Sequence, residues 1–97
     1  MEKYEFEWDD ANVRHIARHG VTPEEAEDVL KRSPIEIGYQ LVDGEERIEL
    51  LGMTRNIRLL TVVITPRSGK IRVVTAFPAN PRLRATYFKA AGFLHDK

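Results

Sequence analysis

From the segment IRLLTVVITPRSGKIRVVTAF, residues 57–77, most of the architecture can be inferred. It holds two runs rich in Ile, Leu, Val and Thr, the residue types that favour β-strands. Between the runs stands Pro66-Arg67-Ser68-Gly69, a sequence typical of a turn. We therefore expect a β-hairpin with strands at 57–65 and 70–77.

The register of this hairpin determines which side chains share a face of the sheet. We expect Arg72 to lie opposite Val62 and Thr75 opposite Leu59. One face would then form the core and carry Ile57, Leu59, Thr61, Val63, Ile71, Val73, Thr75 and Phe77. The other would mix cations with aliphatic side chains, half-covered by the last helix, and carry Arg58, Leu60, Val62, Ile64, Lys70, Arg72, Val74 and Ala76. A single β-bulge would reverse this assignment.

Further strands are expected upstream of the hairpin. Alternating apolar residues predict strands at 35–39 and 47–53, with Asp43-Gly44 as the turn between them. Aromatic and acidic residues alternate at 4–8, which predicts one more strand with a single buried face. Consecutive strands joined by short turns favour an antiparallel meander.

Three helices are expected around these strands. The first runs from a cap at Asp9 or Asp10 through Arg18 and ends at His19-Gly20. The second begins at Thr22-Pro23-Glu24-Glu25, where a hydroxyl, a proline and a Glu three residues after the hydroxyl form a capping box. The third spans 82–91, after Asn80 and Pro81. The order β-α-α-β-β-β-β-α predicts an α+β domain in which helices pack on an antiparallel β-meander.

Composition narrows the class of protein. The chain has 97 residues, 42% of them hydrophobic and 31% charged, which is typical of one folded domain spanning residues 1–97. It has no cysteine, which excludes disulfide scaffolds, thiolate nucleophiles and cysteine-based zinc sites. No apolar run approaches the ~20 residues of a membrane span, and the polar segment 1–5 does not fit a signal peptide. We expect a cytoplasmic protein without membrane contact.

Charge is distributed unevenly along the chain, although the formal net charge is zero. Residues 1–48 hold 13 of the 15 carboxylates and only 6 of the 15 Lys and Arg side chains. Between Leu50 and His95 there is no Asp or Glu. If the basic side chains of the second half converge, they would attract a polyanion such as RNA. The alternative is a solvated face whose cations pair with the acidic half.

No common catalytic or metal-binding motif is present. The chain has neither a phosphate-cradling glycine loop nor an HExxH sequence. His15 and His19 lie four residues apart on a predicted helix, but no carboxylate at ligand spacing accompanies them. We therefore expect no metal site and no cofactor.

A set of cations and hydroxyls remains, and this set suits phosphodiester chemistry on RNA. Guanidinium groups bind two phosphate oxygens at once and stabilise the charge of the transition state, while the substrate supplies its own 2′-OH nucleophile. The expected catalytic residues are Arg72 and Arg55 on the phosphate, Thr75 and Tyr87 as positioning groups, and His19 for proton transfer. The residues expected to guide the RNA backbone are Arg58, Arg82 and Arg84.

Structural roles compete with these assignments. His19, next to a helix-ending glycine, also suits capping of the helix C-terminus. Tyr87 suits packing with an exposed hydroxyl, and Arg82 and Arg84 suit covering of a helix surface. Arg72, in a central strand, needs a partner or a ligand, and no carboxylate lies near it in sequence.

Several segments together resemble BrnT-type toxins, which belong to the wider RelE-like ribonuclease superfamily. The resemblance covers most of the chain and depends on Phe6-Glu7-Trp8-Asp9, Arg18-His19-Gly20-Val21-Thr22-Pro23-Glu24-Glu25-Ala26, Glu45-Glu46-Arg47, Ile71-Arg72-Val73-Val74-Thr75-Ala76 and the helix from Arg82 to Tyr87. It implies a RelE-like fold and a ribosome-independent RNA endonuclease that arrests growth. It also implies a cognate antitoxin with a ribbon-helix-helix DNA-binding part, and operator binding only through the toxin–antitoxin complex.

Two positions depart from the pattern of the family. Members usually carry an Arg where this chain has Phe77, and many carry a Glu where it has Leu83. Each change replaces a charge with an apolar group, while Arg72, Thr75 and Tyr87 match. Three hypotheses follow: an active endoribonuclease toxin, a RelE-like binding module with weak or no catalysis, or a structural partner whose basic face docks an acidic chain.

Overall fold

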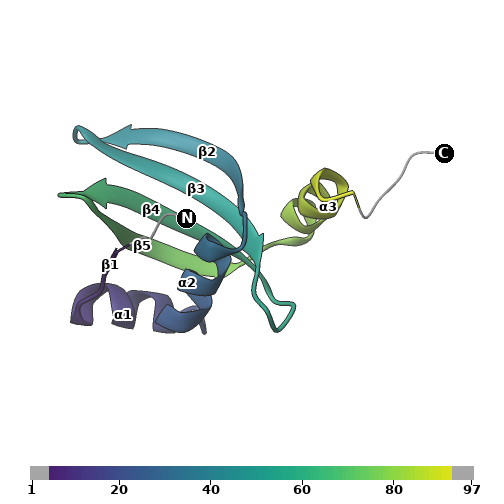
Figure 1. Ribbon diagram of the computed structural model, residues 1–97, viewed down its shortest axis with the longest axis horizontal. Coiled ribbons are helices and arrows are strands. Elements are labelled where there is room, and N and C mark those ends of the chain that lie inside the picture. The colour runs from purple at the N-terminus through teal and green to yellow at the C-terminus, as the bar shows by residue number, and fades with distance from the viewer. Residues whose placement is uncertain (1–4, 93–97) are drawn as a thin grey trace.

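The computed structural model describes residues 5–92, and its elements follow the predicted order β-α-α-β-β-β-β-α (Figure 1). The strands are β1 (Phe6–Glu7), β2 (Ile35–Val42), β3 (Glu45–Met53), β4 (Leu59–Arg67) and β5 (Lys70–Pro78). The helices are α1 (Asp10–Ala17), α2 (Pro23–Lys31) and α3 (Pro81–Ala90). The α+β class is therefore confirmed. No helix in residues 5–92 has the length and apolar character needed to cross a bilayer.

The strands form one sheet in the order β1-β5-β4-β3-β2. Strands β2 to β5 make the expected antiparallel meander, but β1 pairs in parallel with β5, so the sheet is mixed. The first strand is shorter than predicted. Trp8 lies beyond its end, and Tyr4 lies outside the described residues.

The capping signals predict where the helices begin. Asp9 caps α1 in a reciprocal box with Asn12, and Thr22 caps α2 in a box with Glu25. The Asn80 side chain accepts a hydrogen bond from the Leu83 backbone N–H at the start of α3. After α1 the chain passes through Gly20 at a φ of 74°, a left-handed conformation that glycine adopts without steric cost. The reversal lets α2 pack beside α1 (Figure 1).

The predicted register of the β4–β5 hairpin is wrong. Arg72 pairs with Thr65, and Thr75 pairs with Val63. The turn is tighter than expected, with Arg67 opposite Lys70, and a bulge interrupts the pairing after Val63. Because a bulge adds one residue to one strand, side chains on either side of it change face.

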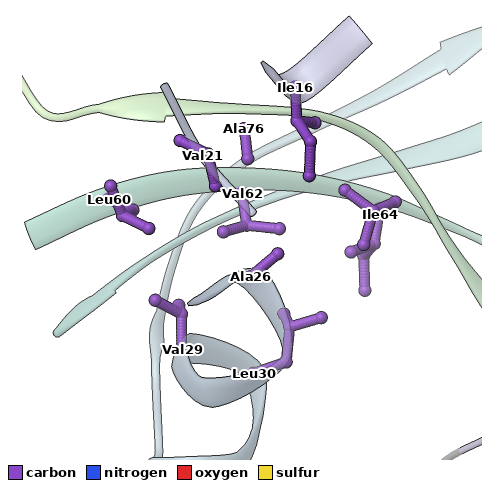
Figure 2. Close-up of a cluster of buried hydrophobic side chains, with 10 residues drawn as sticks. Ile16, Val21, Ala26, Val29, Leu30, Leu60, Val62, Ile64 and Ala76 are labelled. Atoms are coloured by element: carbon purple, nitrogen blue, oxygen red, sulfur yellow. The ribbon is translucent and has the colours of Figure 1, made fainter. Parts of the chain in front are cut away.

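The core consequently lies on the face that was expected to be half-covered and cationic. Figure 2 shows Leu60, Val62, Ile64 and Ala76 of the sheet against side chains of α1, α2 and their connection. The expected register places these four residues on the face opposite the expected core. Ile57, expected in the core, is 79% exposed and lies in the turn before β4 with a φ of 63°. Packing against α1 and α2 therefore determines which face of the β4–β5 hairpin is buried, and counting residues from the turn of the hairpin does not.

The three helices lie at different places around the sheet. Helices α1 and α2 lie together on one side, whereas α3 follows β5 at the end of the sheet where that strand finishes (Figure 1). Helix α3 contacts β3, and none of its residues is buried. Helix α3 therefore lies far from the start of β5.

Candidate functional site

A cavity of about 230 Å³ lies where α1, the start of β3, the end of β4 and the start of β5 meet. Its charged and polar lining comes from Asn12, His15, Glu45, Arg47, Thr65, Arg67 and Arg72, and its remaining lining from Ala11, Val73 and Val74. Strand pairing explains why three arginines meet here. Arg72 pairs with Thr65, and the antiparallel register of β3 and β4 brings Arg47 alongside. We call this space the arginine cavity.

Arg72 is held by carboxylates from the beginning of the chain. Its Nη1 donates to Asp9 Oδ2 at 2.9 Å and its Nη2 donates to Asp9 Oδ1 at 3.1 Å. Glu7 Oε2 lies 4.0 Å from Nη1, because the parallel pairing of β1 places Glu7 beside Arg72. The Arg72 side chain is only 15% exposed. It has the partner that the sequence neighbourhood did not offer, and that partner is more than sixty residues away along the chain.

The other two arginines of the cavity share a carboxylate. Glu45 Oε1 lies 3.2 Å from Arg47 Nη2, and Glu45 Oε2 lies 3.4 Å from Arg67 Nη2. Arg67 Nη1 also lies 3.8 Å from Glu7 Oε1. The three guanidinium groups therefore form one network with the carboxylates of Glu7, Asp9 and Glu45.

These contacts shift the pKa values of the charged groups. Hydrogen bonds from the Arg72 guanidinium and from the Asn12 backbone N–H lower the pKa of Asp9, and the same bond to Asp9 raises the pKa of Arg72. Hydrogen bonds from Arg47 and then Arg67 lower the pKa of Glu45. Asp9, Glu45 and Arg72 are therefore ionised at neutral pH.

Asn12 fixes the position of this network. Its buried side chain donates from Nδ2 to the backbone oxygens of Glu7 and Val73, at 3.0 and 3.1 Å. Its Oδ1 accepts a hydrogen bond from the Asp9 backbone N–H at 2.8 Å. Asn12 thereby links β1, the start of α1 and the bulged part of β5, so it orients Asp9 towards Arg72.

One buried hydroxyl of the cavity lacks a partner. Thr65 is 1% exposed, and within residues 5–92 its Oγ1 has no hydrogen-bond partner. A buried hydroxyl without a partner costs free energy. Here it lies in the lining of a cavity that also holds three arginines, so an anion bound there would satisfy it.

Thr75 lies on the same face as the arginine cavity, contrary to the expected core position. Thr75 pairs with Val63 of β4, and Arg72 pairs with Thr65. Val63 and Thr65 are two residues apart, and residues two apart in a strand share a face. The bulge thus brings Thr75 to the side of Arg72. Two of the expected catalytic residues, Arg72 and Thr75, therefore share a face of the sheet, although Thr75 does not line the cavity.

His19 lies beside the cavity and does not line it. Its ring centroid is 5.7 Å from that of His15 and 6.0 Å from that of Phe77, both in edge-to-face geometry. His15, one turn earlier on α1, lines the cavity. The imidazole nearest to Arg72 along this lining is therefore that of His15.

Arg58 and Arg55 occupy the other end of the sheet. Arg58 Nη1 donates to both carboxylate oxygens of Glu25 at 2.9 Å and to the Gly20 backbone oxygen at 2.8 Å. The Arg55 side chain is 76% exposed, and its Nε lies 3.7 Å from Asp28 Oδ1.

Ion pairing with α2 also shows in the pKa of Glu25. Burial alone would raise this pKa, but hydrogen bonds from the Thr22 backbone N–H and from the Arg58 guanidinium outweigh the burial and lower it. Arg55 lies in a separate hollow of about 380 Å³ along α2, lined mainly by acidic residues. Arg58 lies just before the start of β4, whereas Arg72 pairs with Thr65 near the end of β4, so the two arginines lie roughly 20 Å apart along β4. The expectation that the cations gather around a single groove is therefore wrong for Arg55 and Arg58.

The residues expected from the last helix do not meet Arg72. Arg82, Arg84 and Tyr87 lie on α3, beyond the end of β5, and Arg72 is near the start of that strand. Tyr87 packs its ring edge-to-face on Phe88 at 5.7 Å, and the Arg84 guanidinium lies 5.6 Å from the Phe88 ring centroid. None of the three lines the arginine cavity.

Six charged or polar lining residues were missing from the expected site: Asn12, His15, Glu45, Arg47, Thr65 and Arg67. Arg47 belongs to the Glu45-Glu46-Arg47 segment, one of those in which the sequence resembles BrnT-type toxins, and this resemblance could have indicated Arg47 as a site residue. Arg67 stood in the predicted turn, and only the tight pairing with Lys70 places it on the sheet. No cluster of three His, Cys, Asp or Glu side chains suited to a metal ion occurs within residues 5–92.

A family model described as the ribonuclease toxin BrnT of a type II toxin–antitoxin system matches residues 8–82. The chain belongs to the BrnT toxin family. Residues of the arginine cavity and both Thr75 and Phe77 lie inside the matched range, whereas Arg84 and Tyr87 lie beyond it. No curated protein matches the chain. Membership in a type II ribonuclease toxin family gives RNA as the target and an antitoxin as the partner.

Proposed function

We propose that this BrnT family member is an active, metal-independent endoribonuclease of the cytoplasm, and that the arginine cavity binds the phosphate at the cut. The observation that carries the proposal is the meeting of Arg47, Arg67 and Arg72 in one cavity. Glu45 lines the cavity with them, and Glu7 and Asp9 pair with Arg67 and Arg72 from outside the lining, so an anion would bind through the guanidinium donors that these pairs leave unused. The unpartnered hydroxyl of Thr65 supports the same reading.

The carboxylates leave the arginines able to bind a phosphate. A guanidinium group has five N–H donors, and the bidentate pair with Asp9 uses two of those on Arg72. The remaining donors are free to bind phosphate oxygens, while Asp9 holds the side chain in place. Such preorganised donors act on the charge that develops in the transition state.

The chemistry requires proton transfer at two oxygens. The ribose 2′-oxygen forms a bond to the adjacent phosphorus as its proton moves to a base, and the bond from phosphorus to the 5′-oxygen breaks as that oxygen gains a proton. His15 is placed for proton transfer because it lines the cavity. Arg72 stabilises the pentacoordinate phosphorus, and Thr75 positions the phosphate from the same face. Guanidinium groups supply the charge stabilisation, so this mechanism needs no metal.

The remaining expected residues take other places in this proposal. Arg55 and Tyr87 stand outside the catalytic set because Arg55 lies in the separate hollow along α2 and Tyr87 lies on α3, beyond the end of β5. Arg58, Arg82 and Arg84 contact the RNA backbone away from the cut, through charge that carries no sequence information.

A second function is favoured by one observation. The bidentate pair with Asp9 neutralises the charge of Arg72. A chain in which this pair persists when RNA is bound is a binding module: it binds RNA in a salt-dependent way and does not cut it.

The proposed partner is a ribbon-helix-helix antitoxin encoded beside this chain, with operator DNA bound only by the complex of the two. Family membership supports an antitoxin, and the ribbon-helix-helix type follows from the resemblance of the sequence segments. Co-expression of the adjacent short reading frame and co-purification with this chain test the pairing. Operator binding by this chain alone would contradict it.

The test of the nuclease is RNA cleavage by the purified chain beside Arg72→Ala. Loss of a transition-state contact of this kind lowers the rate by about 10²–10³-fold. The control is Arg32→Ala, which removes the same charge from an exposed position at the end of α2. It is expected to cleave within about twofold of the wild type, because exposed charges act weakly through solvent.

Three measurements separate the outcomes. Circular dichroism establishes that Arg72→Ala is folded, and filter binding at several salt concentrations measures RNA affinity. Cleavage that depends on Arg72 supports the nuclease, whereas salt-dependent binding without cleavage by the wild type supports the binding module. Cleavage by Arg72→Ala at the wild-type rate removes Arg72 from the mechanism.

A further inference from the structure

Three aromatic rings form a row that begins at the arginine cavity. His15 lines the cavity, its ring contacts that of His19 at 5.7 Å, and the His19 ring contacts that of Phe77 at 6.0 Å. The interplanar angles of 75° and 67° show edge-to-face contacts at both steps. We call His15, His19 and Phe77 the ring row.

Local structure explains how the row forms. His15 and His19 are four residues apart across the end of α1, so their side chains lie on the same face of the helix. Phe77 pairs with Thr61 of β4, and Thr75 pairs with Val63. Since Thr61 and Val63 are two residues apart on β4, Phe77 and Thr75 lie on the same face of the sheet. Without the bulge in β5, Phe77 would point into the core.

The row is not part of the hydrophobic core. His15 and His19 are exposed and Phe77 is half-buried, and none of them belongs to the core cluster. A ring that serves packing is buried by its neighbours, whereas the His15 and His19 rings are exposed and Phe77 keeps part of its surface accessible. Exposed, mutually ordered aromatic rings provide contact area that loses little conformational entropy when a ligand binds.

Cations stand beside the row at two points. Arg72 lines the same cavity as His15. Next to the middle ring, Arg58 donates to the backbone oxygen of Gly20, the residue that follows His19. Single-stranded RNA presents phosphates and unstacked bases in alternation, and proteins bind it with cations for the backbone and rings for the bases.

We propose that the ring row is a nucleobase-binding subsite of the RNA site, in which the base next to the phosphate in the arginine cavity stacks on the Phe77 ring and meets the inclined His19 ring edge-on. This inference rests on the proposed function, because it assumes RNA in the cavity. Phe77 stands where the resemblance implies an Arg, so this chain has an aromatic ring in place of a charge at this position. The subsite takes unpaired RNA, since bases in a duplex have no free ring face.

Binding of short probes tests the subsite. The probes are fluorescent RNA oligonucleotides that carry a single 2′-deoxy substitution at the cut to prevent cleavage, with either a base or an abasic sugar beside that phosphate. Variants are Phe77→Leu, which keeps an apolar side chain without a ring, and His19→Ala. The control is Tyr39→Leu, which removes a ring that is 51% exposed on β2. Thermal unfolding of each variant establishes folding.

Loss of a stacking ring weakens binding of the base-containing probe by roughly 5- to 100-fold. We expect this loss for Phe77→Leu and His19→Ala, equal binding of the abasic probe by these variants and the wild type, and no change for Tyr39→Leu. If the wild type binds RNA but Phe77→Leu binds each of the two probes as tightly as the wild type does, the subsite is refuted while the proposed function stands. If the wild type binds neither probe and cuts no RNA, both fail.

Discussion

Asn12→Ala is expected to destabilise the domain more than any loss of a helix cap alone. The Asn12 side chain makes three hydrogen bonds in a buried position: to the Glu7 and Val73 backbone oxygens and from the Asp9 backbone N–H. Each bond contributes about 1 kcal/mol, and a buried group left without a partner costs about 1–3 kcal/mol. We expect a loss of roughly 3 kcal/mol in the free energy of unfolding.

Urea unfolding followed by far-UV circular dichroism measures this change. For a domain of this length, about 3 kcal/mol corresponds to a fall in Tm of roughly 10–25 °C. The control is Asn80→Ala, which removes only the capping bond to the Leu83 backbone N–H of α3. Loss of a cap costs about 1 kcal/mol.

Asn12→Asp separates the two roles of the side chain. The carboxylate keeps an acceptor for the Asp9 backbone N–H but has no donor for the Glu7 and Val73 oxygens, and it places a negative charge beside them. We expect it to be at least as destabilising as Asn12→Ala at neutral pH. If Asn12→Ala costs no more than Asn80→Ala, or if Asn12→Asp matches the wild type, Asn12 does not link β1 and β5 as described.

Two further perturbations test packing and electrostatics. A Cβ at Gly52 would lie 2.9 Å from Val29 Cγ1, so Gly52→Ala is expected to push α2 outward and cost about 1–3 kcal/mol by urea unfolding. Gly38→Ala is the control, since its Cβ meets chiefly the flexible end of a Glu side chain; equal costs would contradict the packing argument. Three carboxyl groups have pKa values below the usual range, namely Asp9, Glu25 and Glu45. The unfolded chain therefore binds more protons than the folded one as the pH falls through about 4, so this stabilisation is present above the unfolded pKa values and lost below the folded ones. We expect the urea midpoint to fall below about pH 4, and a midpoint that rises on acidification would refute this sign.

Part of the candidate site was predictable because its signals are local or cationic. Arg72 stood out as a charge in a central strand that required a partner, whereas Thr75, although named for the site, was expected on the core face and reaches the side of Arg72 only through the bulge. The partner itself, Asp9, was expected only as a helix cap, and it serves both roles. Arg67 and His15 were not expected in the site, because their positions depend on strand register and on how α1 lies against β5.

The sequence alone determined the order of the elements and most of their ends. Caps, turn glycines and apolar periodicity act within a few residues, so Thr22, Asn80 and the Asp43-Gly44 turn mark boundaries without reference to the rest of the chain. Only the tertiary structure decided which face of the hairpin is buried and which acids meet which arginines. A strand alternates its faces at every residue, so one bulge in β5 exchanges core and surface. The ion pairs of Arg72 with Glu7 and Asp9 form only when the sheet brings β1 beside β5.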